Sequence, residues 1–124
     1  MTPALSRRAL VVEDEPLIRM GVVDICETAG MLAEEASNAD EAFRILLSGR
    51  SFALLLTDID MPGSMDGIAL AWRAREVDPN ITVVVVSGKM IAPQAALPAG
   101  SLFFAKPVQE GKLVSTIAEL VEQR

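Results

Sequence analysis

The sequence contains no histidine, no tyrosine and only one cysteine, Cys26. Without histidine, a Ser-His-Asp triad, a histidine-liganded zinc site and a phosphohistidine on this chain are all excluded. A single cysteine cannot form an internal disulfide, and no signal peptide is visible in the sequence. We therefore expect a protein of the reducing cytoplasm.

Positive charge is also scarce. Eleven lysines and arginines stand against seventeen aspartates and glutamates, for a formal net charge of −6. This balance disfavours direct binding to nucleic acid or to anionic lipid. The longest strictly aliphatic runs, such as residues 83–86, are far shorter than the roughly 18 apolar residues of a membrane span, so we expect no membrane association. Chemistry on this chain has to use carboxylates, hydroxyls, lysines and a hard metal ion.

The 124 residues suit one domain, which we assign to residues 1–124. A hydrophobic fraction of 51% and a mean hydropathy of +0.37 indicate a packed core. Five short apolar runs, most of them continuous rather than alternating, predict strands of a parallel sheet that is covered on both faces. These runs are residues 9–12, 31–36, 52–56, 81–86 and 102–105. The second run carries Glu34 and Glu35, which predicts an edge strand.

Amphipathic patterns lie between the runs. They predict helices over residues 16–29, 38–48, 66–77 and 109–122. In the first of these, Ile18, Val22 and Ile25 share one stripe, while Arg19 lies away from it. Residues 89–100 contain two prolines and a glycine, so we expect a shortened or irregular fourth helix there. The alternation of strands and helices predicts a three-layer α/β sandwich with right-handed crossovers.

Polar residues follow four of the predicted strands. They are Glu13-Asp14-Glu15, Asp58-Ile59-Asp60, Ser87-Gly88-Lys89 and Lys106-Pro107. Function in an open parallel sheet lies at the carboxyl ends of the strands, so we expect Glu13, Asp14 and Asp58 to meet at one edge. Repulsion among three carboxylates raises a pKa or recruits a cation. Ligands that are all oxygen suit Mg²⁺.

Two further groups at this edge suit a phosphoryl group. Lys106 supplies a positive charge and Ser87 supplies a hydroxyl donor. Asp58 can attack phosphorus and hold the group as an aspartyl-phosphate. Each of these residues alone is typical of a strand end or a solvated loop, but their combination predicts phosphoryl chemistry.

With these groups in this order, residues 8–122 resemble a response-regulator receiver domain of bacterial two-component signalling. The resemblance implies a flavodoxin-like, doubly wound parallel sheet of five strands in the order 2-1-3-4-5. It also implies that Asp58 is the phosphoacceptor, that Asp14 ligates Mg²⁺ directly, and that Glu13 acts mainly through water. The backbone carbonyl of Asp60 is the third protein ligand by the same resemblance.

The remaining site residues are assigned by the same resemblance. Ser87 matches the switch hydroxyl, Lys106 matches the lysine that contacts the phosphoryl group, and Phe103 matches the aromatic switch position. Asp60 and Lys89 match positions that tune the lifetime of the phosphoryl group. The bond between Lys106 and the following proline is expected to be cis.

The resemblance implies a stand-alone response regulator with no output domain on this chain. Its phosphodonor would be a partner histidine kinase. Phosphorylation would switch its surface for contact with a downstream protein or for homodimerisation. The chain would not be an enzyme beyond slow self-dephosphorylation.

Two alternatives stay open. The residues Asp58-Ile59-Asp60 also resemble the nucleophile motif of haloacid-dehalogenase-like phosphatases, which predicts a small Mg²⁺-dependent phosphohydrolase. In that family the motif follows the first strand, whereas here an acid pair precedes it. The second alternative is a phosphorelay intermediate that passes the group to a histidine phosphotransfer protein.

Overall fold

The computed structural model describes residues 7–88 and 96–122. Strands and helices alternate over most of this length, as the sequence predicts. In chain order they are β1 (Arg8–Val12), α1 (Pro16–Thr28), β2 (Leu32–Ala36), α2 (Ala39–Leu46), β3 (Leu54–Asp58), α3 (Gly67–Val77), β4 (Thr82–Ser87), β5 (Leu102–Ala105) and α4 (Glu110–Glu122).

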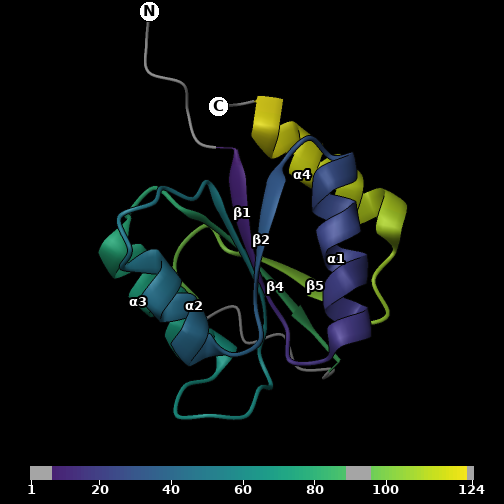
Figure 1. Cartoon of the computed structure of the whole chain (residues 1–124). Helices are drawn as coiled ribbons and strands as arrows, with labels where there is room; N and C mark the ends of the chain where they lie inside the picture. The colour runs from purple at the N-terminus through teal and green to yellow at the C-terminus, as the bar shows by residue number, and fades with distance from the viewer. Residues whose placement is uncertain (1–6, 89–95, 123–124) are drawn as a thin grey trace, which may run out of the picture.

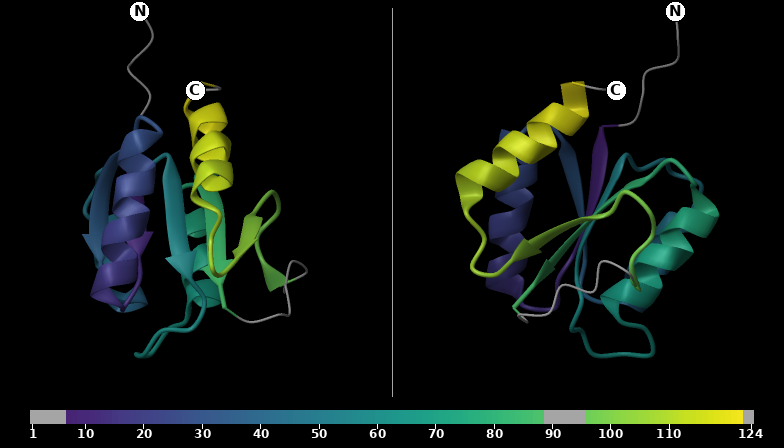
Figure 2. Two further views of the ribbon diagram at one scale, coloured as in Figure 1. Left: turned by 90° about the vertical axis from the view of Figure 1, so that its right-hand side faces the viewer. Right: turned by 180° about the vertical axis from the view of Figure 1, so that it is seen from behind.

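The five strands form one parallel sheet in the order β2-β1-β3-β4-β5. Helices α1 and α4 cover one face of the sheet, and α2 and α3 cover the other (Figures 1 and 2). The predicted three-layer, doubly wound fold and its strand order are therefore confirmed, and β2 lies at the edge as its two glutamates indicate. Among the residues that the structure describes, no helix is both long and apolar enough to cross a membrane.

The core has two halves, one on each face of the sheet. Along β1, Leu10 and Val12 pack toward α2 and α3, whereas Ala9 and Val11 pack toward α1 and α4. Successive side chains of a strand point to opposite faces. Because helices cover both faces of the interior strands, side chains on either face are buried, which is why the apolar runs of these strands are continuous.

Two predicted details are corrected. The third run begins at Phe52, but the strand begins at Leu54 and continues to Asp58, because Thr57 and Asp58 pair with β4. Apolarity therefore marks burial here rather than strand pairing, since Phe52 is buried before the strand begins. Ile18 lies on the predicted buried stripe of α1, yet it is 42% exposed, because α1 leaves a cavity beneath its first turns.

The predicted irregular segment falls partly outside the described residues, which omit 89–95. Its described part, residues 96–100, contains no α-helix. Leu97 is buried in the α2–α3 half of the core. Helix α3 binds this part through Trp72 Nε1 and Arg75 Nη1, which donate to the carbonyls of Ala96 and Ala99 at 2.6 and 2.7 Å.

Helix α3 begins against the backbone of Asp58. The side chain of Asp66 caps the helix by accepting a hydrogen bond from the Ala69 amide at 2.9 Å. The amide of Gly67 donates to the carbonyl of Ile59 at 2.9 Å. A Cβ atom on Gly67 would overlap the carbonyl oxygen of Asp58. Glycine at this position therefore lets the helix hold the carboxyl end of β3 in place.

We expect Gly67→Ala to destabilise the fold by about 1–3 kcal/mol, because the methyl group meets backbone that cannot move aside. Gly111→Ala in α4 is the matched control, since its Cβ would meet nothing within 4 Å. It should leave stability unchanged or raise it by up to about 1 kcal/mol. Urea unfolding measures both changes, and equal stability of Gly67→Ala and the wild type would contradict this account.

Burial makes Cys26 of α1 inert. It is fully buried, and loss of solvation, aided by the charge of Glu27, raises the pKa of its thiol to about 12. At pH 8 the native protein should not react with a disulfide reagent, whereas the unfolded chain should titrate one thiol. The raised pKa also predicts a pH dependence of stability. Above the thiol pKa of the unfolded chain, the unfolded state loses its thiol proton while the native state keeps it. The free energy of unfolding should therefore fall by about 1.4 kcal/mol per pH unit, until the pH reaches the thiol pKa of the native state. Urea unfolding at pH 8 and pH 10 should show a smaller decline in Cys26→Ala, and an equal decline would refute the assignment.

Candidate functional site

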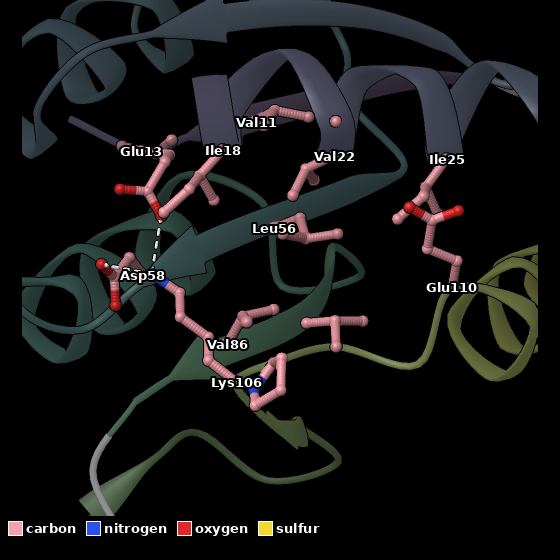
Figure 3. A pocket seen from close by; sticks show the side chains of 14 residues that line it. Val11, Glu13, Ile18, Val22, Ile25, Leu56, Asp58, Val86, Lys106 and Glu110 are labelled. Atoms are coloured by element: carbon pink, nitrogen blue, oxygen red, sulfur yellow. Dashed lines mark hydrogen bonds and ion pairs between the residues drawn. The ribbon is translucent and has the colours of Figure 1, made fainter. Parts of the chain in front are cut away.

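The ammonium group of Lys106 joins the ends of two neighbouring strands. Its Nζ donates to Glu13 Oε1 at 2.8 Å and to Asp58 Oδ2 at 3.1 Å. Glu13 follows β1, Asp58 ends β3, and Lys106 follows β5. Figure 3 shows the three side chains meeting at one end of a cavity. The sequence prediction that these residues share one edge of the sheet is confirmed.

Asp14 completes a cluster of three carboxylates. One oxygen each from Glu13, Asp14 and Asp58 lie within 4.8 Å of one another. Glu13 and Asp58 are buried, whereas Asp14 is exposed. The donors are all carboxylate oxygens with room for water on the Asp14 side, which is the ligand set that Mg²⁺ prefers. The residues present therefore fit a magnesium ion.

The turn that carries the acid pair is held at several points. The amide of Glu13 donates to the carbonyl of Ala36 at 3.2 Å, and the amide of Glu15 donates to Glu13 Oε2 at 3.1 Å. Arg19 Nη1 donates to the carbonyl of Glu13 at 2.8 Å. Arg19 is not among the site residues that the sequence singles out. Its only signal is a cation near the N-terminus of a helix, where the helix dipole favours anions.

Burial and ion pairing oppose each other at this site. Loss of solvation raises the pKa of Glu13, and the hydrogen bond from Lys106 offsets only part of this shift. Burial lowers the pKa of Lys106, but the hydrogen bonds to Glu13 and Asp58, with the charges of both, outweigh it and raise the pKa overall. Lys106 therefore stays protonated and serves as a fixed positive charge.

The cavity beside these groups has a volume of about 460 Å³. Its walls are mainly apolar: Ile18, Val22 and Ile25 come from α1, and Leu56 and Val86 come from the sheet (Figure 3). Glu13, Asp58 and Lys106 form its polar end. Apolar walls lower the polarity on one side of the carboxylates, which strengthens their interactions with a cation.

The other predicted residues lie around this centre. Ser87 is fully buried at the end of β4, one residue beyond the partner of Asp58 in the sheet. Asp60 is exposed, and its amide donates to Asp58 Oδ1 at 3.4 Å. Phe103 of β5 packs against the α2–α3 half of the core. Lys89 lies outside the described residues.

The peptide bond between Lys106 and Pro107 is cis, as predicted. The amide of Lys106 donates to the carbonyl of Ser87 at 2.9 Å. The start of the loop that carries the lysine is thus bonded to the end of the strand that carries the serine.

A family model described as the response regulator receiver domain matches residues 9–118. The chain belongs to the response regulator receiver family. These receivers are phosphoacceptor modules of two-component signalling, so family membership favours this role over the phosphohydrolase alternative. The carboxylate cluster and the lysine found here lie at the edge of the sheet where the sequence resemblance predicts them.

Three similar proteins illustrate the family. The receiver protein CpdR of Brucella abortus is 34% identical over 93% of this chain and 97% of its own length. The sensor kinase CckA of the same organism is 33% identical over 96% of this chain but only 13% of its own length. The response regulator TrrA of Thermotoga maritima, solved in complex with Mg²⁺-BeF, is 25% identical, with a TM-score of 0.78 over 91% of this chain and 97% of that one. Receivers similar to this chain thus occur both as short proteins and as parts of sensor kinases.

Lys106→Ala should bind Mg²⁺ about tenfold more tightly than the wild type, because the lysine ammonium and the metal ion compete for the same carboxylate oxygens. Lys112→Ala removes the same charge from an exposed position on α4 and should change the affinity by less than about twofold, since solvent screens exposed charges. Isothermal titration calorimetry measures both. Unchanged or weaker binding in Lys106→Ala would show that Lys106 does not compete for these carboxylates.

Proposed function

We propose that Asp58 accepts a phosphoryl group from the phosphohistidine of a partner histidine kinase, in a reaction that requires Mg²⁺. The observation that carries this proposal is the position of Asp58. Its carboxylate accepts a hydrogen bond from the Lys106 ammonium and lies beside the acid pair, at the carboxyl edge of the sheet. A carboxylate nucleophile next to both a fixed cation and a divalent metal site suits the transfer of an anionic group.

The transfer moves one phosphoryl group between two nucleophiles. An oxygen of Asp58 forms the new bond to phosphorus while the bond between phosphorus and the imidazole nitrogen of the donor breaks. The electron pair of that bond stays on the imidazole. Negative charge spread over the phosphoryl oxygens is offset by the ammonium group of Lys106, so the contribution of the chain is mainly positioning and electrostatic.

Three residues would hold the metal directly. The carboxylates of Asp14 and Asp58 and the backbone carbonyl of Asp60 would be ligands, and Glu13 would act through a bound water. When bound, Mg²⁺ supplies positive charge that neutralises the phosphoryl oxygens and offsets the repulsion between the carboxylates. The buried side chain of Glu13, tied to Lys106 and to the Glu15 amide, keeps the acidic turn in place.

The response to phosphorylation would pass through Ser87 and Phe103. By the alternation of strand residues, Ser87 follows Val83 and Val85 on the face of the sheet where Phe103 also packs. We propose that the Ser87 hydroxyl bonds a phosphoryl oxygen and that Phe103 shifts with it, which changes the surface next to β5. Such a shift needs two states that differ by a few kcal/mol.

The changed surface would be recognised by another protein. Similarity to the receiver portion of a sensor kinase supports a place in a phosphotransfer chain. Candidate recipients of the signal are a downstream target, a histidine phosphotransfer protein that takes the phosphoryl group onward, or a second copy of this chain.

Incubation with a phosphorylated histidine kinase or with acetyl phosphate in Mg²⁺ should add one phosphoryl group to the protein. Asp58→Asn should abolish the added mass, because the amide cannot act as the nucleophile. Intact-mass spectrometry measures the modification, and removal of Mg²⁺ with a chelator should prevent it.

The matched control is Asp66→Asn, which changes the same residue type in the loop after Asp58 and keeps an N-capping side chain. It should be modified like the wild type. Full modification of Asp58→Asn would refute Asp58 as the acceptor.

A further inference from the structure

Arg19 connects three parts of the molecule that meet at the acid pair. It belongs to α1, its Nη1 donates to the backbone carbonyl of Glu13 at 2.8 Å, and its Nε forms an ion pair with Glu35 of β2 at 3.0 Å. Its side chain is only 19% exposed, whereas Glu35 is 49% exposed. A guanidinium group has donors in a fixed planar fork, so two such contacts define its orientation.

The carbonyl that Arg19 binds lies at the start of the turn that carries Asp14. Glu13 is 4% exposed, and its amide is already bonded to β2 through Ala36. The peptide group that precedes Glu13 is therefore bonded to β2, and the next peptide group, which leads into Asp14, is bonded to α1 through Arg19. Because Asp14 itself is exposed, the path of its backbone rests on these neighbours.

We propose that Arg19 is a positioning residue for the metal site. Its guanidinium group holds the Glu13 carbonyl, and this contact sets Asp14 at the distance from Asp58 that a divalent cation needs. This inference rests on the proposed function of the carboxylate cluster. Residues that orient ligands without touching the metal typically change metal affinity by about 10–100-fold when they are replaced.

Arg19 affects Mg²⁺ affinity in two ways that have opposite signs, which makes the proposal testable. As a positive charge bonded to the backbone of the acid pair, Arg19 repels a divalent cation, so its removal should tighten binding by electrostatics alone. As a positioning residue it organises the ligands, so its removal should weaken binding. The direction of the change in affinity therefore separates the two.

The experiment is a calorimetric titration of the full chain with Mg²⁺. Arg19→Gln should weaken binding by about tenfold, despite the loss of a positive charge. Arg19→Lys should also weaken binding, because it keeps the charge but loses the fork. Glu35→Gln leaves the bond to the Glu13 carbonyl in place and should give a smaller loss in the same direction.

The matched control is an arginine between α2 and β3 that pairs with the same edge strand. Arg50 Nη1 forms an ion pair with Glu34 of β2 at 2.6 Å, but it touches neither the acid pair nor Asp58. Arg50→Gln makes the same change in charge and in chemistry, and should leave Mg²⁺ affinity at the wild-type value.

A second readout needs no metal. In ¹⁵N spectra of the metal-free protein, the Arg19 Nε–H resonance should be protected by its bond to Glu35 and should lose that protection in Glu35→Gln. The Glu15 amide, which donates to Glu13 Oε2, should shift in Arg19→Gln and not in Arg50→Gln. Dispersed spectra from the rest of the chain confirm folding. If Arg19→Gln does not fold, the Mg²⁺ affinity and the spectra of Glu35→Gln provide the test.

The outcomes divide clearly. Weaker binding in both Arg19 variants with unchanged binding in Arg50→Gln supports the proposal. Wild-type or tighter binding in either Arg19 variant overturns it, as does an equal loss in Arg50→Gln. If the wild type itself binds no Mg²⁺, both the proposed function and this inference fail. If the wild type binds Mg²⁺ and is modified on Asp58 while Arg19→Gln binds equally well, only this inference fails.

Discussion

The ion pairs of Lys106 with Glu13 and Asp58 are the interaction on which the site depends. Carboxylates that are buried close together repel each other, and neither has enough water to disperse its charge. The fold brings them together because β1 and β3 are neighbours in a parallel sheet whose carboxyl ends share one edge. Lys106, which reaches both carboxylates from beyond β5, offsets this repulsion until a divalent cation takes its place.

The surrounding backbone makes this arrangement rigid. Gly67 lets α3 start directly against Asp58, and the Glu13 amide continues the pairing of β1 with β2 past the end of the strand. Apolar side chains of α1 and the sheet border the polar groups on one side, while Asp14 stays exposed on the other. A divalent cation and an anionic group can therefore reach carboxylates whose positions are already set.

Much of the fold and the site could be predicted from the residues. Continuous apolar runs locate the strands, and the polar residues after them identify Asp58, Glu13 and Lys106, because burial on two faces and a shared edge leave few other arrangements. The strand order came from family resemblance.

Contacts that depend on tertiary structure alone could not be predicted. Arg19 lies off the apolar stripe of α1, so the periodicity of the helix indicates a solvated side chain. In the structure, however, Arg19 binds the Glu13 carbonyl. Ile18 fits the stripe but borders a cavity.

The central claim is that Asp58 with its neighbours forms a Mg²⁺-dependent acceptor for a phosphoryl group. The most direct test is ¹⁹F spectroscopy of the protein with beryllofluoride, a mimic of a phosphoryl group on a carboxylate. We predict protein-bound fluoride resonances that require both Mg²⁺ and the Asp58 carboxylate. Bound resonances that persist after removal of Mg²⁺ or in Asp58→Asn, or no bound resonances in the wild type with Mg²⁺, would contradict the account.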